Sequence, residues 1–217
     1  MILLAKDLYK SYKSPQKVTV LKGISLSLER GESVAICGRS GEGKTTLLHI
    51  LGTLEAPDSG SIEIGGESSF ALSSARLRNR HIGFVFQAYN LLEDFTTLQN
   101  VLMPALIARQ RVDREKGLSL LRKVGLEDRA DFPVKFLSGG ERQRAAIARC
   151  LCNDPDLILA DEPSGNLDRG NSLKIGELLF SLVKEEKKSL VLVTHDFELA
   201  ALCDRRYLLL EGRLVLQ

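Results

Sequence analysis

The sequence predicts an α/β fold with a mostly parallel central sheet, and three observations lead to this class. Short apolar runs bounded by polar residues recur along the chain, as the buried strands of a parallel sheet do. Two short patches alternate between apolar and polar residues, as half-exposed antiparallel strands do. The middle of the chain shows helical spacing instead. We therefore expect a single domain over residues 1–217, with an antiparallel β subdomain and a helical subdomain at about residues 88–150.

The expected strands follow directly from these patterns. Apolar runs predict strands of the central sheet at residues 33–37, 82–86, 157–160, 190–194 and 207–210. The alternating patches at residues 25–28 and 61–64 predict the antiparallel subdomain.

Helical spacing is present in four segments. They are residues 45–51, 98–108, 114–124 and 141–152. Pro104 lies inside the second segment, and Gly125 closes the third. The second and third segments are expected to form most of the helical subdomain.

The composition is that of one globular domain and excludes several classes of partner. The chain has 217 residues and 44% hydrophobic content, which suffices for a sizeable core. Its 30 Lys and Arg residues nearly cancel 28 Asp and Glu residues, and a net charge of +2 indicates neither nucleic acid nor an anionic bilayer as the main partner. The longest apolar runs fall far short of the ~20 residues that span a membrane. Any membrane passage is therefore expected to belong to another chain.

Two further features favour the cytoplasm. Residues 1–5 are apolar, but no basic region precedes them and the run is shorter than the apolar part of a signal peptide. The four cysteines form no Cys-x-x-Cys pair, so reduced thiols are the simplest interpretation.

A glycine-rich loop connects the first expected parallel strand to a helix. It fits G-x-x-x-x-G-K-[ST], the P-loop pattern, and reads Gly38-Arg39-Ser40-Gly41-Glu42-Gly43-Lys44-Thr45, followed by Thr46. Glycines let backbone N–H groups wrap a polyphosphate, and the helix that begins at Lys44 directs its positive end at the same charge. We expect Lys44 to reach the β- and γ-phosphates and Thr45 to bind Mg²⁺. Glu42 repels an anion, so its side chain is expected to point to solvent; the alternative to a nucleotide site is a plain glycine-rich turn.

Two carboxylates follow the apolar run at residues 157–160. Because side chains alternate along a strand, Asp161 and Glu162 can take different tasks. We expect Asp161 to hold the Mg²⁺ shell and Glu162 to polarise the attacking water. Alone, the pair would be interpreted as a solvated strand end; the P-loop makes the chemical interpretation the better one.

His195 follows the apolar run at residues 190–194. A single histidine after a strand is more often structural than catalytic. Here it is the third polar group to follow an apolar strand, and open parallel sheets bind ligands at the carboxyl ends of their strands. We therefore place it at the same edge as the loop and the acidic pair.

A fourth motif, Leu137-Ser138-Gly139-Gly140-Glu141, lies between the loop and the acidic pair. The P-loop, the Leu-Ser-Gly-Gly motif, the Asp-Glu pair and the histidine follow one another in this order. In this respect the chain resembles the nucleotide-binding subunit of an ABC transporter over nearly its whole length. The resemblance implies a P-loop NTPase core of RecA-like type, ATP and Mg²⁺ as cofactors, and an ATPase that drives a separate membrane permease. It also implies a peripheral location on the cytoplasmic face of the inner membrane, with membrane contact only through the permease.

The resemblance assigns further residues. Gln87 corresponds to the glutamine that contacts the metal and the reaction centre, Asp168 to the acid of the loop after the Asp-Glu pair, and Tyr12 to the aromatic that stacks on adenine. Catalytic roles fall to Glu162, His195 and Gln87. The remaining positions implied to contact nucleotide or metal are Gly38, Arg39, Ser40, Gly41, Glu42, Gly43, Lys44, Thr45, Thr46, Ser138, Gly139, Gly140, Glu141 and Asp161.

The Ser138 motif opens a helix whose N–H groups suit a γ-phosphate. In the family that phosphate belongs to the neighbouring subunit, so a homodimer with two composite sites is implied. Glu141 stands where many relatives carry Gln, and Gly165-Asn166 where many have other small residues. Both features resemble the subgroup of lipoprotein-release, macrolide-export and cell-division ATPases. Residues 90–101 look closest to the lipoprotein-release members, although Gln99 stands where Glu is commoner.

Two other classes are less well supported. A small GTPase also has a P-loop, but the Asn-Lys-x-Asp motif that reads its base is missing from the sequence. A soluble ABC ATPase that acts on DNA or ribosomes would share every motif above. Members of that kind carry long coiled coils or two cassettes in one chain, and this sequence has neither.

Overall fold

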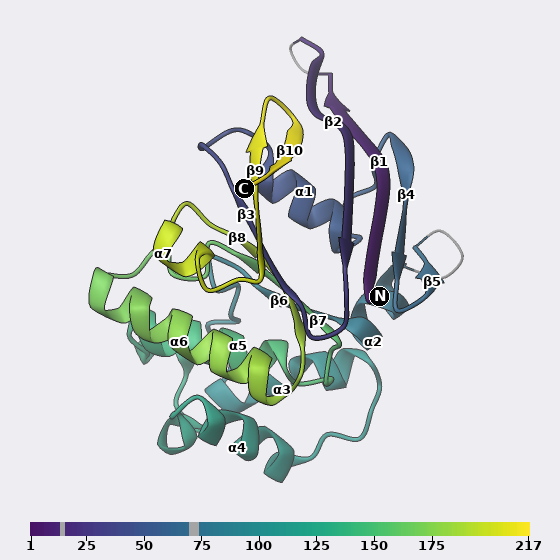
Figure 1. Cartoon of the computed structure of the whole chain (residues 1–217). Coiled ribbons are helices and arrows are strands. Elements are labelled where there is room, and N and C mark those ends of the chain that lie inside the picture. Colours follow the sequence, from purple (N-terminus) through teal and green to yellow (C-terminus); the bar gives the residue numbers. More distant parts are fainter. Residues whose placement is uncertain (14–15, 70–73) are drawn as a thin grey trace.

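A central six-stranded sheet organises the computed structural model, which describes residues 1–13, 16–69 and 74–217 (Figure 1). Within these residues the strand order is β10-β9-β3-β8-β7-β6, parallel throughout except that β10 pairs antiparallel with β9 at one edge. The strands are β3 (Ser33–Cys37), β6 (Ile82–Val85), β7 (Leu157–Asp161), β8 (Ser189–Val193), β9 (Arg205–Leu210) and β10 (Arg213–Leu216). The predicted mostly parallel sheet is confirmed, and β10 was not predicted.

The central strands are buried on both faces, which is why they are continuously apolar. Successive side chains of a strand point to opposite faces. In β3, Ala35 and Cys37 join one apolar core, and Val34 and Ile36 join the other. Alternate residues of β7 and β8 divide in the same way between the two cores.

An antiparallel sheet covers one of these cores. Its order is β2-β1-β4-β5 among the described strands β1 (Leu3–Tyr12), β2 (Val18–Leu28), β4 (Ser59–Ile64) and β5 (Glu67–Ser68). The two predicted patches lie within β2 and β4, and both strands pair with β1 rather than with each other. Helix α1 (Lys44–Leu51) contributes apolar side chains to the core between the two sheets.

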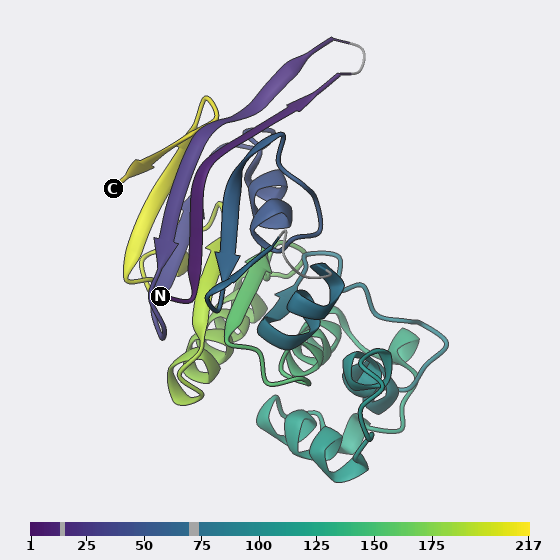
Figure 2. The same ribbon diagram turned by 90° about the vertical axis from the view of Figure 1, so that its right-hand side faces the viewer.

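Helices cover the other face and extend to one side of the sheet (Figures 1 and 2). They are α3 (Thr97–Ile107), α4 (Arg114–Lys123), α5 (Gly139–Cys150), α6 (Arg169–Glu185) and α7 (Phe197–Ala200), with 3₁₀ turns η1 (Glu127–Arg129) and η2 (Val134–Phe136). Helix α2 (Ser74–His81) leads directly into β6. Helices α3 and α4 start and end within one residue of the predicted segments, whereas α5 begins two residues earlier than predicted, because Ser138 is its N-cap.

Two further properties of the described residues concern their helices and their cysteines. None of their helices has the length and apolar character that crossing a membrane requires. All four cysteines are buried free thiols. Burial raises the pKa of Cys150 and of Cys203 to about 12, so neither thiol ionises at neutral pH in the folded chain.

Candidate functional site

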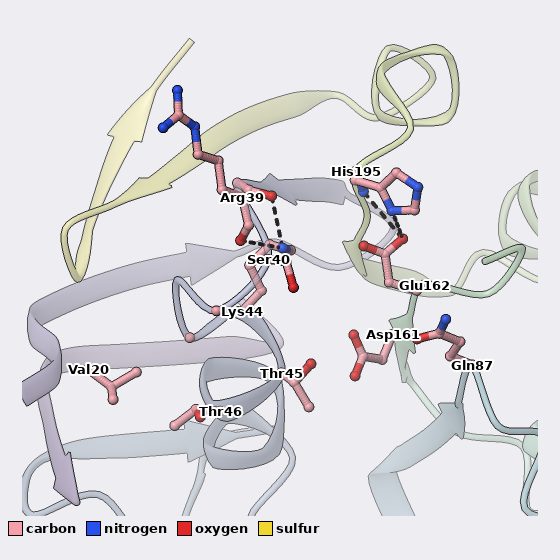
Figure 3. Close-up of a pocket in the computed structure, with 13 residues that line it drawn as sticks. Val20, Arg39, Ser40, Lys44, Thr45, Thr46, Gln87, Asp161, Glu162 and His195 are labelled. Atoms are coloured by element: carbon pink, nitrogen blue, oxygen red, sulfur yellow. Dashed lines mark hydrogen bonds and ion pairs between the residues drawn. The ribbon is translucent and has the colours of Figure 1, made fainter. Parts of the chain in front are cut away.

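A cavity of about 720 Å³ lies at the carboxyl ends of β3, β7 and β8 (Figure 3). It brings together most of the predicted site residues, because the carboxyl ends of parallel strands meet at one edge of a sheet. The residues that line it are Val20, Gly38, Arg39, Ser40, Gly41, Gly43, Lys44, Thr45, Thr46, Gln87, Asp161, Glu162 and His195.

The start of α1 leaves its backbone donors available to a ligand. Its N-cap is Gly43, which has φ 97° and no side chain that could accept an N–H from the first turn. A Cβ at Gly43 would lie 2.3 Å from Val20 Cγ1, so only glycine fits there. The first turn contains no acidic residue. These features suit an anion at the helix start.

Lys44 and Glu42 point in different directions from the loop. The Lys44 ammonium is buried and donates to the carbonyls of Gly38 at 2.8 Å and Arg39 at 3.0 Å. Glu42 Oε2 accepts a hydrogen bond of 3.1 Å from the backbone N–H of Glu211, in the turn between β9 and β10. Glu42 thus points away from the cavity, and its hydrogen bond lies in an exposed position. Its carboxylate is kept off the cavity by a bond to a neighbouring turn.

Asp161 has the character of a cation ligand. Its side chain is buried, and Oδ1 lacks a hydrogen-bond partner within the described part of the chain. Burial raises the pKa of Asp161, while a hydrogen bond with Thr45 acts in the opposite sense. A buried, unpartnered carboxylate oxygen is costly. A divalent cation beside Thr45 and Asp161 would satisfy it, so these residues fit such an ion.

The small number of protein ligands at this site is typical of Mg²⁺ sites. Among the described residues no group of three His, Cys, Asp or Glu side chains could hold a metal by itself. Mg²⁺ commonly binds through one or two carboxylates and takes its other ligands from water and substrate phosphates. Such an ion at Asp161 would therefore depend on a bound polyphosphate.

Glu162 is held towards the cavity by β8 and His195. It has φ 44°, a left-handed conformation that is uncommon outside glycine and that often occurs at functional sites. Its N–H donates to Val193 O at 2.9 Å, which continues the pairing of β7 with β8. Its Oε2 accepts from His195 Nδ1 at 2.9 Å and from the His195 N–H at 3.3 Å (Figure 3). The histidine ring is 71% exposed. The carboxylate of Glu162 can therefore act as a base, and His195 fixes its orientation.

The loop that carries Gln87 is tied down at both ends. Gln87 and Asn166 exchange two hydrogen bonds, of 3.2 and 2.8 Å. Further along, the guanidinium of Arg149, in the last turn of α5, donates to Tyr89 O at 2.7 Å and also to Asn90 O. Both of those residues have positive φ, 57° and 53°. Burial lowers the pKa of Arg149. The loop is thus linked to α5 and to the segment after β7.

Several predicted site residues do not line the cavity. They are Tyr12, Glu42, Asp168 and the motif at Ser138, Gly139, Gly140 and Glu141. The Tyr12 hydroxyl lies 3.4 Å from Thr46 Oγ1 and donates to the Glu55 carboxylate at 2.9 Å, so this ring stands beside the cavity. Asp168 is the N-cap of α6 and accepts from the Asn171 N–H at 3.0 Å.

The Ser138 motif is organised by a capping box. Ser138 Oγ accepts from the Glu141 N–H at 3.3 Å, and Glu141 Oε2 accepts from the Ser138 N–H and hydroxyl at 2.8 Å each. The other carboxylate oxygen accepts from Arg129 Nε at 3.2 Å. The hydrogen bond from the Ser138 N–H is the main reason that the pKa of Glu141 is lowered. The capped N-terminus of α5 thus lies outside the cavity of its own chain.

Three residues of this region were not predicted as functional. Val20 lines the cavity from the antiparallel sheet, and Asn166 and Arg149 hold the Gln87 loop. The sequence marks Asn166 as unusual for the family, but it carries no sign that its partner is Gln87. For Val20 and Arg149 the sequence carries no motif that would single them out.

The geometry is that of a P-loop nucleotide site, and comparisons with known proteins identify the family. The model of the family described as ABC transporter matches residues 21–165. The chain therefore belongs to the ABC transporter family, as the sequence motifs predicted, and it is an ATPase of that family.

Relatives and solved structures agree over almost the whole chain. The lipoprotein-releasing system ATP-binding protein LolD of Protochlamydia amoebophila is 52% identical, over 98% of this chain and 95% of that protein. The protein of the same name from Pseudomonas fluorescens is 47% identical, over 99% and 97%. The dimeric post-hydrolysis structure of the ATP-binding cassette MJ0796 bound to ADP and Pi has a TM-score of 0.89 at 37% identity, over 98% of this chain and 96% of that one.

Proposed function

We propose that this chain is the ATP-hydrolysing subunit of a transporter that releases lipoproteins from the inner membrane. The observation that supports it most is the cavity in which Lys44, Asp161 and Glu162 meet, because it combines a phosphate cradle, a cation ligand and a base. The cargo is inferred from the similarity to lipoprotein-releasing proteins, at 52% identity over 98% of the chain. Macrolide export and cell division remain the alternative tasks within the same subgroup.

Each residue of the cavity has a role in this proposal. Lys44 and the N–H groups of the loop bind the β- and γ-phosphates of ATP, and Tyr12 stacks on adenine at the rim. Thr45, Asp161 and Gln87 would hold Mg²⁺, which would supply positive charge beside the phosphates. Glu162 accepts a proton from the attacking water, and His195 keeps that carboxylate in place.

Two chains are proposed to share each site as a homodimer. The start of α5 is a helix N-terminus with two glycines in its first turn, and it lies outside the cavity of its own chain. In a head-to-tail pair, Ser138, Gly139 and Gly140 of one chain contact the γ-phosphate held by the other, and Asp168 lies at the contact. Two ATP molecules would thus be enclosed between the subunits.

The permease is proposed to dock beside the Gln87 loop. Leu92 and Phe95 follow this loop and are 44% and 39% exposed. Nearby, a cavity of about 380 Å³ is lined by Phe84, Phe86 and Ile107 among others. An exposed apolar surface of this kind suits a helix of a membrane protein. The chain would then sit on the cytoplasmic face of the inner membrane, held there by the permease alone.

Purification followed by reconstitution tests this function. The tagged chain is isolated from its own membranes, the associated membrane protein is identified, and both are placed in vesicles that contain an acylated lipoprotein. We expect ATP to release the lipoprotein into solution, and Glu162→Gln, a matched control that keeps the side-chain shape, to release almost none.

Changing Leu92 and Phe95 together to Ser should spare ATP binding but weaken co-purification. Release of a macrolide instead, or ATP hydrolysis that never moves lipoprotein, would refute the assigned cargo.

A further inference from the structure

We propose that Asn166 is a positioning residue that fixes the side-chain amide of Gln87 with its oxygen towards the cavity. The inference rests on the proposed role of the cavity as a Mg²⁺-ATP site. Asn166 itself does not line the cavity, so its effect passes through Gln87.

The two hydrogen bonds determine the orientation of both amides. A backbone carbonyl only accepts, so the Asn166 group 2.8 Å from Gln87 O must be its NH₂. The Asn166 oxygen therefore faces the side chain of Gln87. That oxygen also only accepts, so the Gln87 group 3.2 Å away must be its NH₂. The remaining atom of the Gln87 amide, Oε1, is left for other partners.

The surroundings keep the Gln87 amide in this place. Figure 3 shows its oxygen on the side of Asp161 and its nitrogen turned away from that residue. Gly165 lies next to the amide nitrogen, and a Cβ there would come within 2.9 Å of Gln87 Nε2 and 3.3 Å of Cδ. Any larger residue at position 165 would push the amide out of position. The pair Gly165-Asn166 thus supplies both the space and the hydrogen bonds.

The orientation matters because the two ends of an amide are opposite in polarity. Mg²⁺ binds oxygen ligands, and an NH₂ group in the same position would repel it. A free glutamine amide can present either end, whereas Asn166 favours one. The net effect of a hydrogen bond of this type corresponds to about fivefold in an equilibrium constant. Loss of Asn166 should therefore weaken Mg²⁺ binding by a factor of that order.

The test measures Mg²⁺ binding by the full chain without relying on hydrolysis. The fluorescent, non-hydrolysable analogue mant-AMP-PNP is bound to wild type and to Asn166→Ala, first in EDTA and then with increasing Mg²⁺. We expect equal affinity in EDTA and a Mg²⁺ midpoint about fivefold higher in Asn166→Ala. Asn166→Ser also lacks both bonds and carries the test if the alanine variant does not fold.

Gln87→Glu provides the decisive control. A carboxylate presents oxygen in either orientation, so in this background Asn166→Ala should leave the Mg²⁺ midpoint unchanged. An unshifted midpoint in Asn166→Ala, or the same shift with Gln87→Glu present, would overturn the inference. Failure of wild type to bind the analogue at any Mg²⁺ concentration would instead remove the proposed function, and the inference with it.

Discussion

Helix α1 begins after a glycine-rich loop and α5 begins with two glycines, but their first turns are built differently. The N-cap of α1 is Gly43, and the first turn has no acidic residue. The N-cap of α5 is Ser138, whose hydroxyl and N–H are both bonded to the carboxylate of Glu141. The start of α1 is therefore open to an anion, while that of α5 already has a negative group beside it.

This difference distinguishes two kinds of phosphate contact. At α1 a phosphate gains donors that the protein leaves free, next to the ammonium of Lys44. At α5 a phosphate would meet the carboxylate of Glu141, which already bonds the Ser138 N–H and hydroxyl and, through its other oxygen, Arg129. We therefore expect the cavity side to bind ATP in a single chain, and the α5 side to act only when a partner brings its own phosphate.

The largest effect is expected on the cavity side, from Glu162→Gln. The amide cannot accept the proton of the attacking water, so hydrolysis should fall by roughly 10²–10⁴-fold. ATP binding should persist, and a long-lived dimer should form because repulsion between Glu162 and the γ-phosphate is removed. Turnover measurements with the permease present, together with gel filtration in ATP, check both expectations. Turnover equal to wild type would mean that Glu162 is not the base.

The next effect is expected on the α5 side, from Ser138→Arg. ATP binding by the single chain should be normal, but the bulky side chain should block closure and hence hydrolysis. Mixing with Lys44→Ala sharpens the result, because a heterodimer can place both lesions in one composite site and leave the other intact. We expect ATPase activity to recover in proportion to the heterodimer fraction. Full activity of Ser138→Arg alone would contradict the shared site, and no recovery despite heterodimer formation would contradict independence of the two sites.

The smallest effect is expected from Glu141→Gln, through pH. The folded pKa of Glu141 is lowered, so its stabilising contribution is present above the unfolded value of ~4.3 and is lost as pH falls through the folded value. Gln also forms a capping box, so stability at neutral pH should change by only about 0.5 kcal/mol. Thermal unfolding between roughly pH 5 and pH 3 should show a smaller loss in the variant than in wild type. Identical losses would show that another carboxyl group is responsible.

The parts of the fold that could be predicted are those with a regular pattern of apolar residues in the sequence. The short central strands are buried on both faces, so their residues are continuously apolar. Strand β1 escaped prediction because Asp7, with φ 49°, lies at an irregularity in its pairing and interrupts the alternation. Helix α6 carries buried Ile175 and Leu179 four residues apart, but Gly176 between them weakens the helical pattern. That glycine is needed because a Cβ there would lie 2.1 Å from Leu199 Cδ2.

The same distinction holds at the site. The residues that we propose to contact the ligand directly belong to motifs with fixed spacing, and most of them line the cavity. Asn166 and Arg149 act through another side chain or through main-chain carbonyls, so their partners depend on how distant segments pack. Such a relation leaves no local pattern in a single sequence.

The bonds of Arg149 to Tyr89 O and Asn90 O have a consequence for how such a subunit could diversify. Main-chain carbonyls are present whatever the side chain, so substitutions at positions 89 and 90 need not break the link to α5. The requirement that remains is a positive φ at both positions, which favours Asn and Gly. Side chains at these two positions can therefore vary within that limit while the hydrogen bonds to Arg149 of α5 persist.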